Sequence, residues 1–348
     1  MSQPPFRSPG PARPRPRGAR SRPARLLAAA LVLSAAASGA VPEGMAAAAH
    51  AGEAPGTTFW VDPNSAAAHQ VTAWRSEGRT ADALLIERIA GRPQALWLND
   101  PGPGPTVRAA TEAATAAGRT AVLVAYHIPH RDCGDYSGGG AASAAEYRRW
   151  IDEFAAGIGD RAAYVIVEPD AVAQKIAGCA KADAQERYGL LAYAVDRVKA
   201  RPHTKVYLDA GNAGWIPDEN RLVDPLREAG IARADGFALN VSNYQTNEVS
   251  SDYGHRLAAA LGGAKHFVVD SSRNGNGPYT GGDEAWCNPP GRALGSPPTT
   301  ATGDPALDAY LWVKRPGESD GTCRGGPRAG QWWPQYALGL ASRAQGQD

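Results

Sequence analysis

The sequence predicts an α/β fold in which parallel strands form a barrel with helices packed around it. Two observations predict this class: short apolar runs rich in Val, Leu, Tyr and Phe recur along the chain, and stretches of helical period separate them. Near-continuous apolar strands are typical of parallel sheets covered on both faces, and seven or eight of them favour a closed β/α barrel. An open doubly wound sheet is the alternative, but no G-x-G-x-x-G follows the first run to indicate nucleotide binding.

The apolar runs and the helical segments alternate along the chain. The runs expected to form strands are Thr58–Val61, Ala95–Leu98, Ala121–Tyr126, Tyr164–Val167, Val206–Leu208, Gly236–Leu239, His266–Val269 and Ala309–Val313. Helical period is found between them in Ser143–Ile158, Ala184–Ala200, Asn220–Ala229 and Asp252–Leu261. No linker interrupts this pattern, so residues 52–348 are expected to form a single domain.

Charge is unevenly distributed along the chain. The 348 residues contain 36 Lys and Arg against 35 Asp and Glu, but the first 51 hold seven Arg, no Lys and one acid, Glu43. The remaining 297 residues carry 29 basic and 34 acidic side chains, a net charge of −5. Such a domain lacks the basic excess on which nucleic-acid binding depends, and that class of function is excluded.

The first 51 residues have the order of a secretory signal peptide. A basic, Pro-rich stretch of 25 residues precedes the apolar run Leu26–Ala37, and small residues ending in Ala49-His50-Ala51 follow it. The apolar run is shorter than the roughly 20 residues that span a bilayer, so a retained membrane anchor is the weaker interpretation. We expect residues 1–51 to be removed and the mature protein to be secreted, without membrane contact.

The four cysteines, Cys133, Cys179, Cys287 and Cys323, suit an oxidising compartment. Four cysteines allow three pairings, and four free thiols are the alternative. We expect two disulfides, and Cys133–Cys179 with Cys287–Cys323 is the pairing that is local in sequence. No C-x-x-C or H-x-x-x-H spacing occurs, so neither a metal nor another cofactor is expected.

Polar and aromatic side chains follow the predicted strands, and in a β/α barrel the chemistry lies at the carboxyl ends of the strands. The residues at these ends are Trp97, Tyr126, Asp132, Glu168, Asp170, Asp209, Asn240, Asn243, Asp270, Arg273, Lys314, Glu318 and Asp320, with Trp215 and Trp286 in nearby loops. Carboxylates beside flat aromatic faces suit the binding and hydrolysis of a polysaccharide, since sugar rings present apolar faces and hydroxyl edges.

Each carboxylate also has a structural interpretation. Asp170 follows an apolar strand, where burial would raise its pKa and suit a general acid, but it also precedes Ala171 as a helix N-cap would. Asp132 fits a turn aspartate paired with Arg131, and Asp320 fits a turn residue before glycine. Structural hydrogen bonding, solvent exposure or core packing would similarly account for Asp209, Asp270, Asn240, Asn243, Lys314, Glu318 and the three tryptophans.

Six motifs taken together are more specific than any single carboxylate. They are YHIPHRDCG (126–134), EPDA (168–171), YLDAG (207–211), NVSNY (240–244), WCNPP (286–290) and WVKRPGESDG (312–321). In this order they resemble glycoside hydrolase family 6, over about residues 57–344. The resemblance implies a distorted, seven-stranded parallel β/α barrel that cleaves β-1,4-glucan with inversion of configuration.

The resemblance also implies roles for the residues at matching positions. Asp170 becomes the general acid, and Asp132 the second carboxylate, which keeps that acid protonated and receives a proton from water, directly or through a water chain. Asp320 matches a candidate base, and Tyr126 a tyrosine that crowds the sugar at the cleavage site. The implied sugar contacts are Trp97, Asp209, Trp215, Asn243, Trp286, Lys314 and Glu318, and the implied disulfides are the sequence-local pair.

One residue departs from the family pattern. After Asp209-Ala210-Gly211 many members have a histidine that contacts sugar, and this chain has Asn212. An amide still forms hydrogen bonds with a hydroxyl but carries no charge. The departure bears on affinity at that subsite and leaves the catalytic assignment unchanged.

Loop length bears on whether the chain cuts glucan internally or from its ends. Only eleven residues, 321–331, separate Asp320 from Trp332, and a short loop here implies an open cleft and an endoglucanase. No cellulose-binding module follows the domain, which favours soluble or amorphous glucan, and a monomer is expected. The alternatives are a cellobiohydrolase that works from chain ends and, in a different class, a secreted glucan-binding protein without activity.

Overall fold

The computed structural model describes residues 59–282 and 284–344. The expected signal peptide, residues 1–51, lies outside the described residues, and so does Thr58 at the start of the first apolar run.

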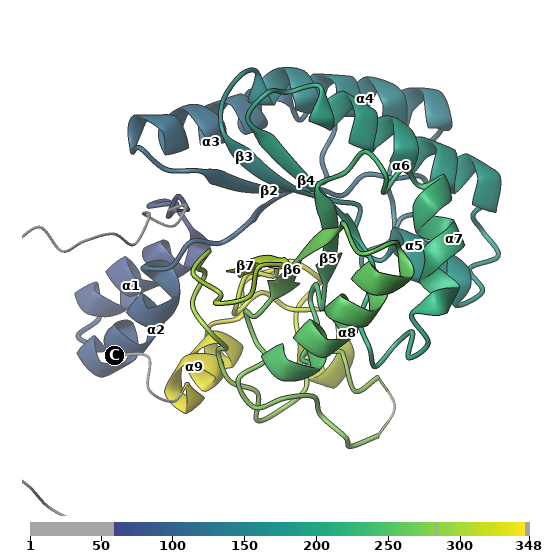
Figure 1. Cartoon of the computed structure of the whole chain (residues 1–348). Coiled ribbons are helices and arrows are strands. Elements are labelled where there is room, and N and C mark those ends of the chain that lie inside the picture. The colour runs from purple at the N-terminus through teal and green to yellow at the C-terminus, as the bar shows by residue number, and fades with distance from the viewer. Residues whose placement is uncertain (1–58, 283, 345–348) are drawn as a thin grey trace, which may run out of the picture. The chain divides into compact units, whose positions relative to one another are not determined.

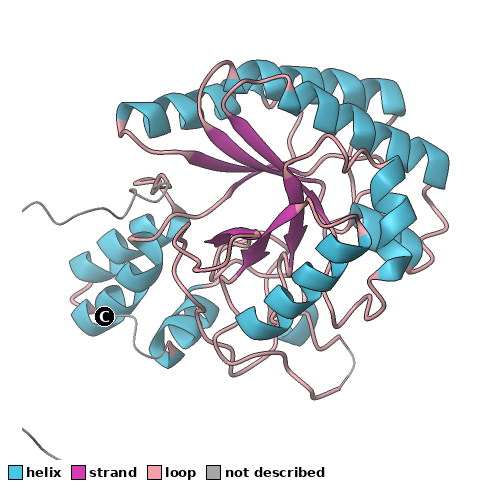
Figure 2. Cartoon of the chain, in the orientation of Figure 1, coloured by secondary structure: helices cyan, strands magenta, loops and turns pink. Residues whose placement is uncertain are grey.

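Seven parallel strands form one curled sheet in chain order (Figures 1 and 2). They are β1 (Leu96–Leu98), β2 (Ala121–Ala125), β3 (Ala163–Val167), β4 (Thr204–Asp209), β5 (Gly236–Leu239), β6 (His266–Asp270) and β7 (Leu307–Leu311). No ladder joins β7 to β1 within the described residues. The distorted seven-stranded β/α barrel is confirmed, whereas full closure is not observed.

Two hydrogen bonds cross the seam between β1 and β7. Ala95 donates its backbone N–H to Trp312 O at 2.9 Å, and the indole Nε1 of Trp97 donates to Val313 O at 2.7 Å. A backbone bond and a side-chain bond therefore hold together the two edges that a closed barrel would join by a ladder.

The expected strand at Thr58–Val61 is wrong. Phe59 forms only an isolated bridge with Thr120, and Trp60 donates its N–H to Thr120 O at 2.9 Å. Both edges of β2 already pair, one with β1 and the other with β3. The backbone of the segment therefore pairs only with Thr120, the residue before β2. The Phe59 ring instead packs inside the barrel, edge-on to Tyr164 at 5.1 Å.

The described residues contain nine α-helices. They are α1 (Ala66–Ser76), α2 (Thr80–Ala90), α3 (Gly104–Ala116), α4 (Ala144–Ile158), α5 (Ala171–Ile176), α6 (Ala184–Lys199), α7 (Asn220–Glu228), α8 (Asn247–Ala260) and α9 (Pro334–Arg343). The four helices predicted from periodicity are confirmed as α4, α6, α7 and α8. Helix α8 begins five residues earlier than predicted, because the Thr246 hydroxyl accepts a hydrogen bond from Val249 N and caps it there.

The two faces of the sheet bury separate cores, as the two-residue period of a strand requires. In β2, Val122 and Val124 face the barrel interior, whereas Leu123 and Ala125 belong to the larger core between the sheet and the surrounding helices. Helices α3, α4 and α6 cover one side of the sheet in Figure 1. A third core joins α1, α2 and α9 around Trp312.

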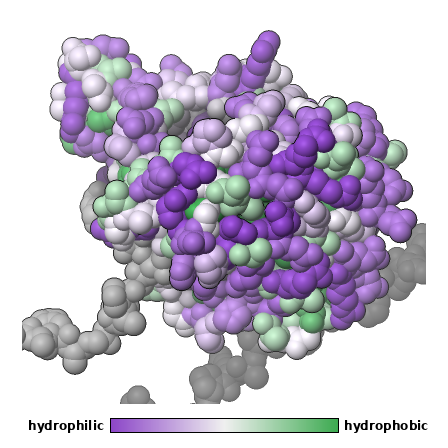
Figure 3. All heavy atoms as spheres, turned by 90° about the horizontal axis from the view of Figure 1, so that it is seen from above, coloured by the Kyte–Doolittle hydropathy of each residue, from purple (hydrophilic) through white to green (hydrophobic). Residues whose placement is uncertain are grey.

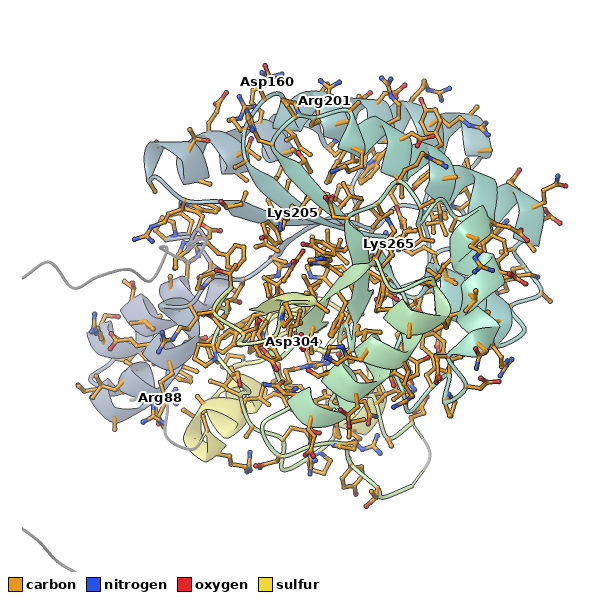
Figure 4. All side chains as sticks on the ribbon, in the orientation of Figure 1. Arg88, Asp160, Arg201, Lys205, Lys265 and Asp304 are labelled. Atoms are coloured by element: carbon orange, nitrogen blue, oxygen red, sulfur yellow. A yellow bond between two sulfur atoms is a disulfide. The ribbon has the colours of Figure 1, made fainter. Side chains whose placement is uncertain are left out.

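A polar network ties strands together near their amino ends. Asp308 of β7 accepts hydrogen bonds from the Tyr207 hydroxyl at 2.5 Å and from Lys205 Nζ at 3.3 Å, both on β4. His266 Nδ1 of β6 lies 2.8 Å from the other carboxylate oxygen. Lys205, labelled in Figure 4, is the second residue of β4. The network links β4, β6 and β7 at the end of the barrel away from the candidate site.

The surface carries no large apolar patch in the view of Figure 3, where apolar side chains lie in small groups among hydrophilic ones. Across residues 59–282 and 284–344, none of the helices combines the length and the apolar character needed to cross a bilayer.

Candidate active site

The residues predicted from the ends of the strands gather at the carboxyl-terminal rim of the barrel. Tyr126 directly follows β2, Asp170 follows β3 by three residues, and Asp209 is the last residue of β4. Burial raises the pKa of Tyr126 well above its usual value, and the nearby charges of Asp170 and Asp132 raise it further. These side chains therefore share one electrostatic environment.

Asp170 does not act as a helix cap. It precedes α5 in a left-handed conformation (φ 71°, ψ −17°), and its side chain caps no N–H of that helix. Its carboxylate accepts no hydrogen bond from any described residue. Desolvation, then the charge of Asp209, then that of Asp132, raise the pKa of Asp170 well above its usual range, against a smaller opposing effect of Lys314. The carboxyl group of Asp170 therefore keeps its proton to a higher pH than an ordinary aspartate does.

Asp132 lies in a short 3₁₀ turn, Asp132–Gly134, and is not paired with Arg131. The guanidinium of Arg131 instead donates to the carbonyls of Tyr126 and Ser137, at 2.9 and 2.8 Å. Asp132 Oδ2 accepts from Ser137 N at 2.7 Å, and Oδ1 accepts from Gln174 Nε2 at 2.8 Å. Burial raises the pKa of Asp132 in spite of these donors.

Asp209 supports Asp170 from beneath. Its Oδ1 accepts from the backbone N–H of Asp170 at 2.9 Å and from that of Gly211 at 3.1 Å, while Oδ2 is buried without a partner. Burial raises the pKa of Asp209 to about 7. Asp209 therefore contacts the backbone of Asp170, and its charge raises the pKa of the Asp170 side chain.

Glu168 organises the loop that carries Tyr126. It is buried, with φ 48°, and its carboxylate lies 3.0 Å from the N–H groups of His127 and Ile128. Burial raises its pKa to about 7, against the lowering by these two N–H groups. Glu168 therefore links the segments that follow β2 and β3 through hydrogen bonds to the backbone.

Asp320 is buried in a network rather than exposed in a turn. Its Oδ2 accepts from Arg273 Nη1 at 2.9 Å, from Asn288 N at 3.0 Å and from the Tyr244 hydroxyl at 3.2 Å. Lys314 Nζ lies 3.5 Å from Oδ1. Burial raises the pKa of Asp320, but Arg273 and Lys314 together outweigh it and lower the pKa below the usual value. Asp320 stays ionised and is a weak base.

The other predicted polar residues differ in how free they are. Lys314 is buried and donates to Ser319 O at 3.0 Å, and burial lowers its pKa. Glu318 pairs with Arg315 at 2.8 Å. Asn243 Oδ1 accepts from Tyr244 N at 2.9 Å.

Asn212, the departure from the family pattern, is buried and partly committed to its own loop. Its Oδ1 accepts from Gly214 N at 3.0 Å and from Trp215 N at 3.1 Å. Its Nδ2 contacts no hydrogen-bond acceptor among the described residues and stays available as a donor.

Asn240 and Asp270 have the structural role that was the alternative for them. Asn240 donates to Asp270 O at 2.8 Å and accepts from Gln245 N at 2.9 Å. Asp270 accepts from the N–H groups of Ser242, at 3.0 Å, and Lys314, at 2.9 Å, so it holds the loops after β5 and β7 together.

The aromatic residues occupy unequal positions. Trp97 is half-buried, its ring edge-on to Tyr126 at 5.0 Å. Trp215 is also half-buried, and it packs against the main core. Trp286 is 39% exposed and lies 6.0 Å from the ring of Tyr136. Trp286 therefore presents the largest free aromatic surface of the three.

Both predicted disulfides are confirmed, Cys133–Cys179 and Cys287–Cys323. The first joins the Asp132 turn to the segment after α5, and the second joins the Trp286 loop to the loop after Asp320. Among the described residues, no group of three or more His, Cys, Asp or Glu side chains is arranged to hold a metal ion.

Residues whose contacts with the site carboxylates are described above but which were given no role from the sequence include Arg273, Gln174, Asn288 and Tyr244. Arg273 follows β6 by three residues, so the rule for strand ends identifies it as a rim residue but not its pairing with Asp320. Gln174 lies on α5 and contacts Asp132, 42 residues earlier in the chain. Asn288 lies 32 residues before Asp320. Local spacing gives no signal for either contact, because both are long-range.

Known proteins with similar sequences and structures bear on this site. The family model of glycosyl hydrolases family 6 matches residues 54–344. Endoglucanase A of Cellulomonas fimi is 45% identical over 295 residues, which cover 84% of this chain and 62% of that protein. Endoglucanase 1 of Streptomyces halstedii is 42% identical, with 86% and 94% covered.

A solved structure extends the likeness to three dimensions. Endoglucanase Cel6 of Mycobacterium tuberculosis, in complex with methyl-cellobiosyl-4-deoxy-4-thio-β-D-cellobioside, is 46% identical with a TM-score of 0.77, and 83% of this chain and 98% of that chain are covered. The family match spans all the described residues. The chain therefore belongs to glycosyl hydrolases family 6.

Proposed function

We propose that the chain is a secreted endo-β-1,4-glucanase that inverts the anomeric configuration. The observation that carries the proposal is Asp170, whose carboxyl group has no hydrogen-bonding duty and whose pKa is raised by desolvation, by Asp209 and by Asp132. A carboxylic acid that stays protonated beside other carboxylates is what protonation of a glycosidic oxygen requires. The relatives named as endoglucanases support the substrate class.

In the proposed reaction, Asp170 gives its proton to the glycosidic oxygen as the C–O bond breaks. A water molecule attacks the anomeric carbon from the opposite face and loses a proton, so the new C–O bond has inverted configuration. Asp132 receives that proton, directly or through water, because its raised pKa makes it the better acceptor. Asp320 is the weaker candidate, since Arg273 and Lys314 lower its pKa.

The sugar contacts follow from the positions around the rim. Trp286 offers an exposed face for stacking, and Trp97 and Trp215 offer partly exposed ones. Tyr126 lies beside Asp170 and Asp132, where it crowds the ring at the cleavage point. Asn212, Asn243, Lys314, Glu318 and Asp209 supply polar contacts, with Nδ2 of Asn212 as a donor to a sugar hydroxyl.

Internal cleavage is supported by the loop after Asp320. Ser319 donates to Gln331 O and accepts from Gly330 N, both at 2.9 Å, so residues 320–329 form a loop closed at its base. The Cys287–Cys323 disulfide also anchors it. A loop tied down at both places lacks the length to roof a bound chain.

Viscometry tests internal cleavage and export together. Cells that express the full chain should release an activity that lowers the viscosity of carboxymethylcellulose long before reducing ends accumulate. Each internal cut greatly shortens a polymer chain but creates only one new reducing end. Cells that express residues 52–348 after a start methionine should retain that activity, since we propose residues 1–51 as the export signal and 52–348 as the catalytic domain. Slow viscosity loss against fast release of cellobiose would indicate a chain-end enzyme, and no hydrolysis would indicate a binding protein.

The stereochemistry provides a separate test. Proton NMR of a short cello-oligosaccharide during hydrolysis should detect the α-anomer of the newly formed reducing end first, before mutarotation mixes the anomers. A β-anomer as first product would require a covalent intermediate and would contradict the mechanism in which Asp132 accepts the proton of water.

A further inference from the structure

Gln174 is a polar side chain of the rim to which the proposed function assigns no role. It lies on α5 one turn after Asp170, and its backbone N–H donates to Asp170 O at 2.8 Å. Its Nε2 donates to Asp132 Oδ1 at 2.8 Å. The Cys133–Cys179 disulfide joins the same two segments. One short helix therefore carries Asp170 at its start and contacts Asp132 through Gln174.

Asp132 receives only donors in this structure. Ser137 N–H faces Oδ2 and the Gln174 amide faces Oδ1, so both contacts favour the ionised carboxylate. In the proposed reaction, Asp132 then takes a proton from the attacking water. If that proton is on Oδ1, an O–H group meets the NH₂ of Gln174, and donor faces donor.

The Gln174 amide has a second arrangement that removes this conflict. Its Oε1 is buried and has no hydrogen-bond partner. A half-turn of the amide brings Oε1 to Asp132, where it accepts from the new O–H group, and no bond of Oε1 is broken. Each orientation leaves one amide group unsatisfied, so neither orientation is locked by its surroundings.

We propose that Gln174 is a positioning residue whose amide orients Asp132 in both of its protonation states during the reaction. With Nε2 towards Asp132 it supports the carboxylate that receives the proton, and with Oε1 towards Asp132 it supports the acid that returns the proton for the next cycle. The inference rests on the proposed function and deepens it, since it names how the proton-accepting carboxylate is controlled.

Other charges also face Asp132, and the test must keep them constant. Arg131 and Asp135 lie on its own loop, and Asp170 and Tyr126 lie across the rim. The ammonium group of Lys181 packs against Gly134 in the same turn. None of these groups changes when Gln174 is replaced.

Gln174→Met keeps the side-chain volume and removes both amide groups. Loss of the donor should raise the pKa of Asp132, so the acid limb of the kcat/KM profile on soluble glucan should move up by about one pH unit. We expect kcat to fall about 10-fold with KM changed less than about two-fold, since the sugar contacts remain. Lys175→Met is the matched control: it removes a hydrogen bond from the same helix, to Cys179 O, and should leave the pH profile unchanged.

Gln174→Glu is the second variant, and it tests the proposal even if Gln174→Met folds poorly. A carboxylate of the same shape adds a negative charge beside Asp132 and should shift the acid limb in the same direction and further. Thermal unfolding of each variant checks its fold. If the wild type is active and both folded variants keep its pH profile and kcat, the Gln174 proposal is overturned and the proposed function stands. If the wild type itself hydrolyses no β-1,4-glucan, the proposed function falls, and this inference with it.

Discussion

Asp170→Ala is expected to lower kcat on β-1,4-glucan by about 10²- to 10⁴-fold, the usual contribution of a positioned general acid. The proton donor is lost, whereas the sugar contacts around the rim remain, so KM should change little. Initial rates of reducing-end release, measured with wild type and variant at the same pH, check the expectation.

The same variant should unfold at an unchanged or higher temperature. The pKa of Asp170 is raised in the folded protein, so the folded state favours the neutral acid. The stability of the fold therefore declines as the pH rises from the usual pKa of aspartate, where the unfolded chain ionises, to the higher folded pKa, and alanine removes that decline. Asp183→Ala is the matched control, because Asp183 does cap α6 through Glu186 N at 2.8 Å. It should lose about 1 kcal/mol of stability and keep its activity. Near-normal kcat in Asp170→Ala would refute the acid assignment.

Arg273→Met is expected to have the largest effect on stability, a loss of about 3–5 kcal/mol. The guanidinium is fully buried, and it donates to Asp320 at 2.9 Å and to Ser242 O at 2.6 Å. Without it, Asp320 keeps two neutral donors, Asn288 N and the Tyr244 hydroxyl, and Lys314 is the positive charge that remains beside it. Urea unfolding at pH 7 measures the loss.

The loss should depend on pH. Arg273 lowers the pKa of Asp320, so in the wild type this pair stabilises the fold above the usual pKa of aspartate and loses that effect on acidification. The difference between wild type and variant should therefore shrink as the pH falls. The double variant Arg273→Met/Asp320→Asn should recover part of the stability, since no unpaired carboxylate is left. Arg197→Met, which breaks an exposed pair with Asp152, should cost less than 1 kcal/mol and serves as the control. An equal loss in both single variants would contradict the buried-pair argument.

The sheet was predictable because its strands are apolar on both faces. The helices that follow strands were predictable where apolar residues recur every three or four positions. Helix α4 illustrates this, with Ser143 as its cap and Tyr147, Trp150, Ile151 and Phe154 buried. The predicted strand at Thr58–Val61 was wrong because a run of strand-forming residues does not reveal whether a sheet edge is free to pair with it. The helices α1, α2 and α9 were missed as a group, and they share a core of their own, apart from the barrel.

The candidate site was predictable as a set of positions but not as a network. The rule for strand ends indicates Asp170 and Asp209 without any knowledge of their contacts. Asp320 looked like a turn residue, because nothing local to it reveals that Arg273, 47 residues earlier in the chain, lies 2.9 Å away. Local spacing reveals a shared helix face, whereas partners brought together by the sheet become visible only in three dimensions.

The seam between β1 and β7 gives the barrel one mechanical joint. Each of the other six junctions is a ladder of paired strands, whereas this one depends on Ala95 N–H and the Trp97 indole. The Trp97 side chain therefore supplies one of the two hydrogen bonds at the junction that has no ladder. Trp97, whose face we propose as a sugar-stacking platform, thus also helps to hold β1 against β7. A substitution at Trp97 would affect both sugar binding and the geometry of the barrel.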